Sequence, residues 1–214
     1  MELSPDDLAP RQRYKLMTGC IVPRPVAFVS TVSTDGRFNL APFSFFNGVG
    51  SDPMMVMFCP ANRPDDGQDK DTLRNCRRAG EGGVGQFVIN AAVAAYQRQV
   101  AAAAEALAPG ESEFELVGLT PAPSRVVKPP RVAESPWAFE CETAQVIRTN
   151  PGVPGGGNLV LGRVVHIWAS DDVVGENLHV DAGALDAVGR MSGFGYCTTR
   201  DRFEIPPGRA ALEN

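Results

Sequence analysis

Three phenylalanines lie within four residues of one another in APFSFFNGVGSDP, the segment at residues 41–53. Ser44 and Asn47 stand among these rings, and Gly48 and Gly50 follow. Alternate side chains of a strand point to opposite faces, so core packing explains each ring but not the small polar groups between them. A flat heteroaromatic ligand needs apolar surface against its faces and fixed hydrogen bonds at its polar rim. The segment therefore predicts a binding wall for such a ligand.

A lysine, an aspartate and a threonine follow one another at Lys70, Asp71 and Thr72, where a helix is predicted to begin. Taken alone, this segment is typical of a surface lysine beside a capped helix start. A helix N-terminus with exposed N–H groups, a hydroxyl and an ammonium is, however, also a ready site for an anion. FMN joins a flat ring to a phosphate, so the two segments together predict an FMN site.

Motifs for other chemistries are weak in this chain. The glycines at 155–157 lie between two predicted strands without the spacing of a phosphate-binding loop, so a flexible hairpin explains them better. His166 and His179 stand in no metal-ligand spacing, and Asp171 with Asp172 is more typical of a solvated turn. We therefore predict no metal site and no catalytic side chain.

The composition is that of a globular protein and argues against two classes of partner. The chain has 214 residues, 43% hydrophobic and 21% charged, with a net charge of −5 and a pI near 5.1. This acidic balance disfavours nucleic acid, which needs clustered Lys and Arg. No apolar run approaches the roughly 20 residues of a membrane helix, and MELSPDDLAP lacks the apolar core of a secretory signal. We therefore predict a cytoplasmic protein with no membrane or nucleic-acid partner.

The cysteines are an odd, scattered set without a CxxC pair, at Cys20, Cys59, Cys76, Cys141 and Cys197. This distribution disfavours both a disulfide framework and a structural zinc site. We predict reduced and mostly buried thiols, with a catalytic thiol as the less favoured alternative.

Runs of β-branched and aromatic residues predict strands at 24–33, 37–47, 54–59, 85–90, 137–149 and 158–170. The Asp35–Gly36 pair predicts a tight hairpin between the first two strands, because it tolerates positive φ angles. Helices are predicted at 10–19, 70–80 and 91–107, the second capped by Asp71 and carrying basic residues in its C-terminal half. Short turns join successive strands and a regular βαβ alternation is missing. These patterns favour a mainly β antiparallel barrel or sandwich with attached helices, in one domain spanning residues 1–214.

At these residues the chain resembles the flavin reductase-like, FMN-binding split-barrel family, which includes flavoredoxin. Five segments carry the resemblance, in family order from about Pro23 to Pro206: residues 23–58, KDTLRN at 70–75, residues 114–136, LGRVVHIW at 161–168 and ALDAVGRMSGFGY at 184–196. The resemblance implies a six-stranded antiparallel split β-barrel with attached helices. It also implies a homodimer, with FMN near the subunit interface.

Carried over residue by residue, the resemblance places the cofactor on three segments. VSTVS brings three residues near it: Thr31, Val32 and Ser33. APFSFFN lines the isoalloxazine ring with Ala41, Pro42, Ser44, Phe45, Phe46 and Asn47. The phosphate and ribityl end is held by Lys70, Asp71 and Thr72. The residue implied for the nicotinamide substrate is His166.

The chain departs from the family pattern in two places. Where many relatives have a His-x-His pair after two valines, this chain has His166-Ile167-Trp168, which removes any nicotinamide contact made by the second histidine. The segment AGEGGVGQFVINAAVAAY after the KDTLRN helix is richer in glycine than usual. We expect this loop to shape the pocket differently.

The resemblance implies an enzyme, an NAD(P)H-dependent flavin oxidoreductase in which hydride passes through flavin N5 and the protein supplies orientation. Two alternatives stay open. A flavoprotein electron carrier reduced by a protein partner is favoured by the missing second histidine, and a non-catalytic barrel could bind another ligand. The choice between NADH and NADPH, and any partner oxygenase, are also open.

Overall fold

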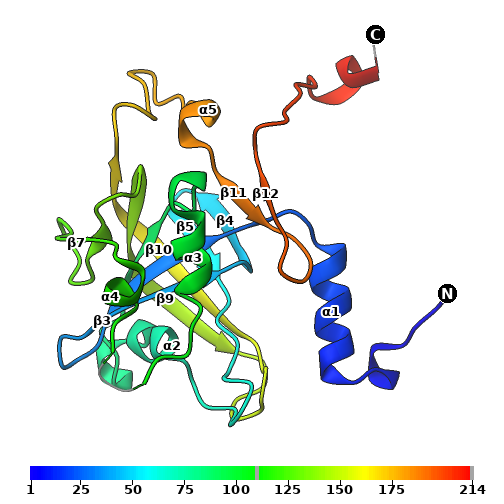
Figure 1. The fold of residues 1–214 in the computed structure, drawn as a ribbon, viewed down its shortest axis with the longest axis vertical. Helices are drawn as coiled ribbons and strands as arrows, with labels where there is room; N and C mark the ends of the chain where they lie inside the picture. The colour runs from blue at the N-terminus through cyan, green and yellow to red at the C-terminus, as the bar shows by residue number, and fades with distance from the viewer. Residues whose placement is uncertain (109–110, 213–214) are drawn as a thin grey trace.

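The computed structural model describes residues 1–108 and 111–212. Its centre is a curled antiparallel sheet with the strand order β3-β2-β6-β9-β10-β5-β4 (Figure 1). The strands are β2 (Ala27–Val32), β3 (Phe38–Phe43), β4 (Phe46–Ser51), β5 (Met54–Phe58), β6 (Gln86–Asn90), β9 (Trp137–Arg148) and β10 (Asn158–Ala169). The mainly β, antiparallel prediction with attached helices is confirmed.

The prediction of one strand at 37–47 is wrong, because the chain forms two strands there and the sheet has seven strands rather than six. β3 and β4 lie at opposite edges of the curled sheet, and only Ser44 and Phe45 connect them. Inside the curl, the rings of Phe43 and Phe58 have centroids 5.2 Å apart, and those of Phe58 and Phe87 are also 5.2 Å apart. This aromatic packing draws the two edges of the sheet together.

The predicted hairpin at Asp35–Gly36 is confirmed. β2 and β3 pair antiparallel from Ala27 with Phe43 to Val32 with Phe38. The turn is closed by the Ser33 N–H, which donates to the Arg37 carbonyl at 2.9 Å. Gly36 has φ +87°, which a glycine adopts without strain.

The sheet buries apolar side chains on both faces. The inside of the curl holds Val29, Phe58 and Phe87, and the helix α2 (Asp71–Cys76) covers it with Leu73 and Cys76. The outside holds Phe28 and Leu40 under α3 (Gln97–Ala102), α4 (Glu113–Val117) and the short hairpin of β7 (Pro121–Ala122) and β8 (Arg131–Val132). These two faces follow from the alternation of side chains along β2 and β3.

The helices differ from prediction in extent. α1 (Pro10–Cys20) is as expected, but α2 ends at Cys76 and its N-cap is Lys70 rather than Asp71. The predicted helix at 91–107 is reduced to the 3-10 turn Ala94–Tyr96 followed by α3, because the backbone at 91–93 pairs with neighbouring segments. Ala91 N–H donates to the Trp137 carbonyl at 3.3 Å, and Val93 bridges Ala187.

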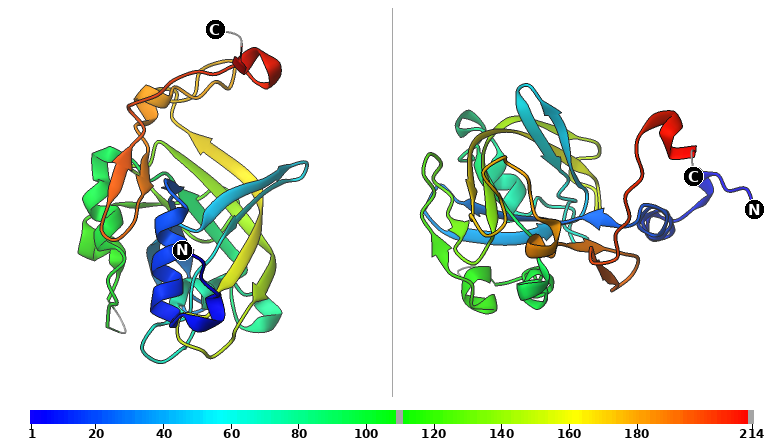
Figure 2. Two further views of the ribbon diagram at one scale, coloured as in Figure 1. Left: turned by 90° about the vertical axis from the view of Figure 1, so that its right-hand side faces the viewer. Right: turned by 90° about the horizontal axis from the view of Figure 1, so that it is seen from above.

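A second, three-stranded sheet joins the ends of the chain to the barrel. It contains β1 (Arg24–Pro25), β11 (Val188–Arg190) and β12 (Tyr196–Thr198). α1 and the segment after β12 project from the same side of the barrel (Figures 1 and 2). The remaining short elements are α5 (Ala182–Leu185) and the 3-10 turns Pro5–Asp7, Ala79–Glu81 and Gly208–Leu212. Within residues 1–108 and 111–212, no helix combines the length and apolarity needed to cross a membrane.

Candidate functional site

The predicted binding wall, here called the ring wall, comprises residues 44–47. It lies where the chain passes from the edge strand β3 to the edge strand β4. Phe45 and Phe46 are half-buried and Asn47 is exposed. Backbone pairing fixes the wall, since the Phe45 carbonyl accepts from the Cys59 N–H at 2.8 Å and Phe46 pairs with Phe58 in the sheet. The wall therefore offers aromatic surface beside polar groups on a rigid backbone.

A buried arginine, Arg24, lies behind this wall and was missed by the sequence reasoning. Its side chain spans Ser44 and Phe45: Nε donates to the Ser44 hydroxyl at 3.2 Å, and Cζ lies 6.0 Å from the centroid of the Phe45 ring. Arg24 is only 4% exposed. Arg24 is the first residue of the strand predicted at 24–33, and nothing in that segment indicated its distant partners.

Two of the predicted hydroxyls are buried and bind asparagines. Asn75 Nδ2 donates to Thr31 Oγ1 at 2.9 Å, and Asn39 Nδ2 donates to Thr72 Oγ1 at 2.9 Å. All four residues are buried, so these hydrogen bonds dock α2 against β2 and β3. A contact of Thr31 or Thr72 with a ligand stays a prediction.

The other residues of the predicted VSTVS and APFSFFN contacts take ordinary places in the hairpin. Val32 is buried, and the hydroxyl of Ser33 accepts from the Arg37 N–H at 2.9 Å within the turn. Ala41 and Pro42 are half-buried in the middle of β3. They lie between the ring wall and the hairpin turn.

Lys70 is the N-cap residue of α2, and no described group accepts a hydrogen bond from its ammonium. Lys70 is exposed, but nearby protein atoms partly desolvate its ammonium and lower its pKa below the usual value. α2 has only six residues, so its dipole is a smaller source of positive charge than the prediction assumed. Asp71 forms an ion pair with Arg74.

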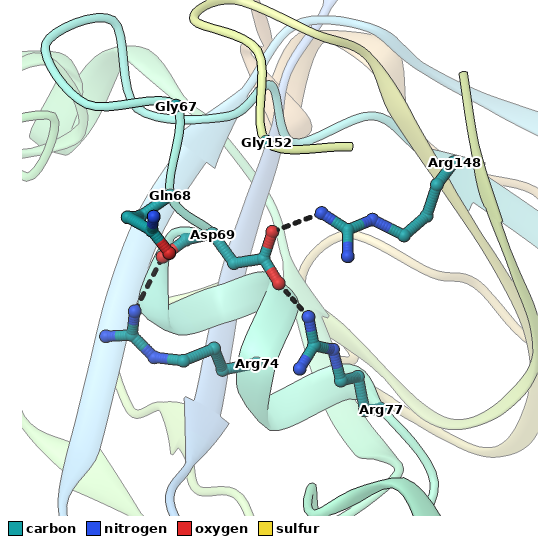
Figure 3. A pocket seen from close by; sticks show the side chains of 7 residues that line it. All are labelled: Gly67, Gln68, Asp69, Arg74, Arg77, Arg148 and Gly152. Atoms are coloured by element: carbon teal, nitrogen blue, oxygen red, sulfur yellow. Dashed lines mark hydrogen bonds and ion pairs between the residues drawn. The ribbon is translucent and has the colours of Figure 1, made fainter. Parts of the chain in front are cut away.

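Three arginines line a depression of ≈ 330 Å³ beside α2 (Figure 3). Arg77 and Arg148 reach Asp69 from two sides, and Arg74 donates to the Asp69 carbonyl at 2.6 Å. Arg74 lies in the last turn of α2 and Arg77 at its C-cap, as predicted, but both side chains bind Asp69. Their i, i+3 spacing in the sequence could have indicated a shared face, but Arg148 is distant in the chain.

His166 is half-buried on β10, two strands from β4. It stands opposite Glu140 at a break in the ladder between Val164 and His166. Glu140 is buried, and its carboxylate accepts the N–H groups of residues 125–127 at 2.7–3.2 Å. Trp168 lies two residues further along β10, with the Arg131 guanidinium 4.1 Å from its ring centroid. His166 is thus on the same strand face as Trp168.

The structure disfavours thiolate chemistry at three of the five cysteines. All five are free, but only Cys76 and Cys141 are buried, so the prediction of mostly buried thiols is wrong. Burial raises the pKa of Cys76, Cys141 and Cys59, which keeps these thiols protonated near neutral pH. Within the described part of the chain, no three His, Cys, Asp or Glu side chains gather as metal ligands.

The family model for the flavin reductase like domain matches residues 18–189. The chain belongs to this family. A solved structure of nitrilotriacetate monooxygenase component B from Bacillus cereus is 32% identical, with a TM-score of 0.87 over 96% of this chain and 98% of that chain. A 2-nitrobenzoate 2-nitroreductase from Pseudomonas fluorescens is 28% identical, with a TM-score of 0.80 over 98% and 97%. A split-barrel protein from Shewanella frigidimarina, 21% identical with a TM-score of 0.76 over 97% and 100%, shares the fold.

The flavin reductase like fold of this chain is a split barrel, and the candidate site suits a flavin mononucleotide. The ring wall begins at Ser44 and the α2 docking begins at Asn39, at opposite ends of β3. Five residues of an extended strand span about 17 Å. Aromatic surface at one end and an unpartnered ammonium with a basic depression at the other match the two chemically different ends of FMN.

Proposed function

We propose that this flavin reductase like protein is an NAD(P)H-dependent flavin oxidoreductase that binds FMN along β3. The observation that carries the proposal is the placement of two features at opposite ends of β3: the aromatic wall at Phe45 and Phe46 follows its last residue, and α2, with Lys70 at its N-cap, docks near its first. Family membership supports a flavin as the ligand. The positions of the aromatic wall and Lys70 support the orientation of FMN, with its ring at the wall and its phosphate at Lys70.

In this proposal the ring of FMN lies against residues 44–47 and its phosphate lies at Lys70. Ser44 and Asn47 supply the polar rim contacts, and Ala41 and Pro42 face the middle of the ligand. Thr31 to Ser33, Asp71 and Thr72 form the wall behind the ribityl chain. The ammonium of Lys70 neutralises the phosphate charge through a charge-assisted hydrogen bond.

The chemistry needs little from the chain beyond orientation. Held by residues 44–47 and Lys70, FMN would supply the hydride acceptor, N5, for a reduced nicotinamide. His166 is positioned by β10 to contact the nicotinamide, with Trp168 on the same face. This chain therefore binds and orients two flat ring systems.

We propose that the protein is a homodimer and that a second copy covers the ring wall. Tyr14 and Met17 are 60% and 43% exposed and share one face of α1, at i and i+3. Ile21, the C-cap residue of α1, is 54% exposed. Phe203 and Ile205 in the projecting C-terminal segment are 84% and 62% exposed. Apolar side chains gathered on projecting segments are typical of association surfaces. A cytoplasmic location stays a prediction from the sequence.

The similarity to a monooxygenase component B motivates a further part of the proposal. We propose that the reduced flavin made at this site serves an oxygenase partner. If this is correct, anaerobically reduced protein that is mixed with such an oxygenase will transfer its reduced flavin to the oxygenase.

The second candidate is an electron-carrying flavoprotein that a protein partner reduces. The observation that favours it is Trp168, which stands where the family pattern has a second histidine. Under this alternative FMN is bound tightly, and neither NADH nor NADPH reduces it.

One spectroscopic experiment separates these functions. The protein is loaded with FMN, desalted, and mixed anaerobically with NADH or NADPH. Retained flavin absorbance that bleaches with either nucleotide supports the reductase, and retained absorbance that does not bleach supports the carrier. Loss of all flavin on desalting, together with no binding in an equilibrium titration, would exclude both.

A further inference from the structure

Arg24 is a buried cation without an anionic partner. It is 4% exposed, and no carboxylate among residues 1–108 and 111–212 lies within ion-pair distance of it. Its acceptors are all neutral: besides Ser44, the two NH1 bonds go to the Thr18 and Ile21 carbonyls at 2.6 Å, and NH2 donates to the Met191 carbonyl at 3.0 Å. Burying a charge is costly unless a partner compensates it.

Capping of α1 explains only part of this arrangement. Thr18 and Ile21 belong to the C-terminal end of α1, where the helix dipole is equivalent to about half a negative charge. That leaves a substantial positive charge in a low-dielectric setting. It also leaves the bond to Ser44 and the position over Phe45 unexplained, because neither belongs to α1.

The unexplained contacts both belong to the ring wall. We propose that Arg24 is a positioning residue that fixes Ser44 and Phe45 against the flavin ring and raises the flavin reduction potential through its charge. This inference rests on the proposed function. Two-electron reduction leaves the bound flavin anionic at its N1 and C2 carbonyl edge, so a nearby buried cation favours the reduced form.

The surroundings of Arg24 keep its charge effective. α1, the hairpin loop at Met191 and the end of β3 enclose the guanidinium, so solvent and salt screen it weakly. The bond to Met191 joins residues 167 positions apart. The same contacts therefore tie α1 and the loop between β11 and β12 to the wall.

The test compares three variants of the full-length, FMN-loaded protein. Arg24→Gln removes the charge. Arg24→Lys keeps the charge, but an ammonium cannot make all four hydrogen bonds of the planar guanidinium. Arg190→Gln is the matched control, because Arg190 stands opposite Arg24 in the β1–β11 ladder but is more exposed. For each protein, FMN affinity is measured by absorbance titration, the midpoint potential by anaerobic dye equilibration, and the fold by thermal unfolding of the apoprotein.

We expect Arg24→Gln to bind reduced FMN about tenfold more weakly relative to oxidised FMN, which lowers the two-electron potential by about 30 mV. Arg24→Lys should keep a potential near that of the wild type while oxidised FMN binds about fivefold more weakly, as expected for loss of a hydrogen bond that orders the wall. Arg190→Gln should change neither property.

Two results would overturn the inference while leaving the proposed function intact. One is an Arg24→Gln protein with the wild-type potential, and the other is an Arg24→Lys protein whose potential falls as far as that of Arg24→Gln. Arg24→Met is measured in parallel and replaces Arg24→Gln if the latter does not fold. Wild-type protein that binds no FMN would instead overturn the proposed function, and this inference with it.

Discussion

At the scale of single residues, Lys70 is the most specific indication that the ligand carries an anionic group. It is the N-cap residue of α2, its ammonium has no acceptor among the described residues, and desolvation by neighbouring groups lowers its pKa although the residue is exposed. Asp71, beside it, is already engaged by Arg74, and Thr72 by Asn39. Lys70 is therefore the residue of the predicted phosphate segment that is free to bind an anion.

Replacing Lys70 should discriminate between flavins. We expect Lys70→Ala to weaken FMN binding by about 1.5–3 kcal/mol, the usual value of a charge-assisted hydrogen bond, and to leave riboflavin almost unchanged. Isothermal titration of both ligands measures the difference. Lys128→Ala, at an exposed lysine on the connector, is the control and should affect neither ligand. Equal losses for FMN and riboflavin would place Lys70 outside the phosphate site.

The lowered pKa of Lys70 also sets a pH dependence. The phosphate contact is fully present while the ammonium is protonated and is lost as the pH rises through the Lys70 pKa, below its usual 10.5. The ratio of FMN affinity to riboflavin affinity should therefore fall between neutral pH and pH 10.5. Ionisation of the isoalloxazine ring affects both ligands alike, so it does not change this ratio. In Lys70→Ala the ratio should not vary with pH. A wild-type ratio that stays constant would contradict the role of Lys70.

At the scale of elements, β3 and α2 determine where the two ends of the ligand lie, and the sequence predicted them unequally. The strands at 54–59, 85–90, 137–149 and 158–170 could be predicted closely because β-branched and aromatic runs mark them. The break at Ser44 could not, because neither Ser44 nor Phe45 is a glycine or proline, and the nearby Pro42 lies within β3. It depends on Phe43 packing against Phe58, a contact between strands that are not sheet neighbours.

Candidate site residues divide in the same way. Ring-wall and lysine segments could be recognised from local composition, whereas Arg24 and Arg148 could not. Their partners are distant: Arg24 bonds Met191 across 167 positions, and Arg148 bonds Asp69 across 79. Local patterns carry no information about such long-range hydrogen bonds.

The docking of α2 can be tested through Thr31. We expect Thr31→Val to lower the free energy of unfolding by about 1–3 kcal/mol, because the Asn75 amide loses its buried acceptor while the side-chain volume is kept. Thr34→Val, in the exposed hairpin turn, should stay within about 0.5 kcal/mol of the wild type. Urea denaturation monitored by fluorescence measures both. Similar stabilities for the two variants would mean that the Asn75 bond does not hold α2.

At the scale of the whole molecule, the projecting ends are the clearest sign of assembly. α1 and the segment after β12 lie on one side of the barrel and carry large exposed apolar side chains (Figure 2). Arg24 ties α1, together with the loop between β11 and β12, to the ring wall. Assembly and flavin binding should therefore depend on each other.

A charge placed on the apolar face of α1 should separate the subunits. We expect wild-type protein to have twice the 22.8 kDa chain mass in light scattering, and Met17→Asp to have the single-chain mass with weaker FMN binding. Lys15→Asp lies on a different face of α1 and should remain dimeric. A wild-type protein with the single-chain mass would contradict the dimer, and a dimeric Met17→Asp would exclude this face from the interface.

A crystal structure of the protein with FMN tests the central claim most directly. The account predicts the isoalloxazine ring against Phe45, Phe46 and Asn47, with the phosphate within hydrogen-bond distance of the Lys70 ammonium. A ring bound elsewhere on the barrel, or a phosphate pointing away from α2, would contradict it.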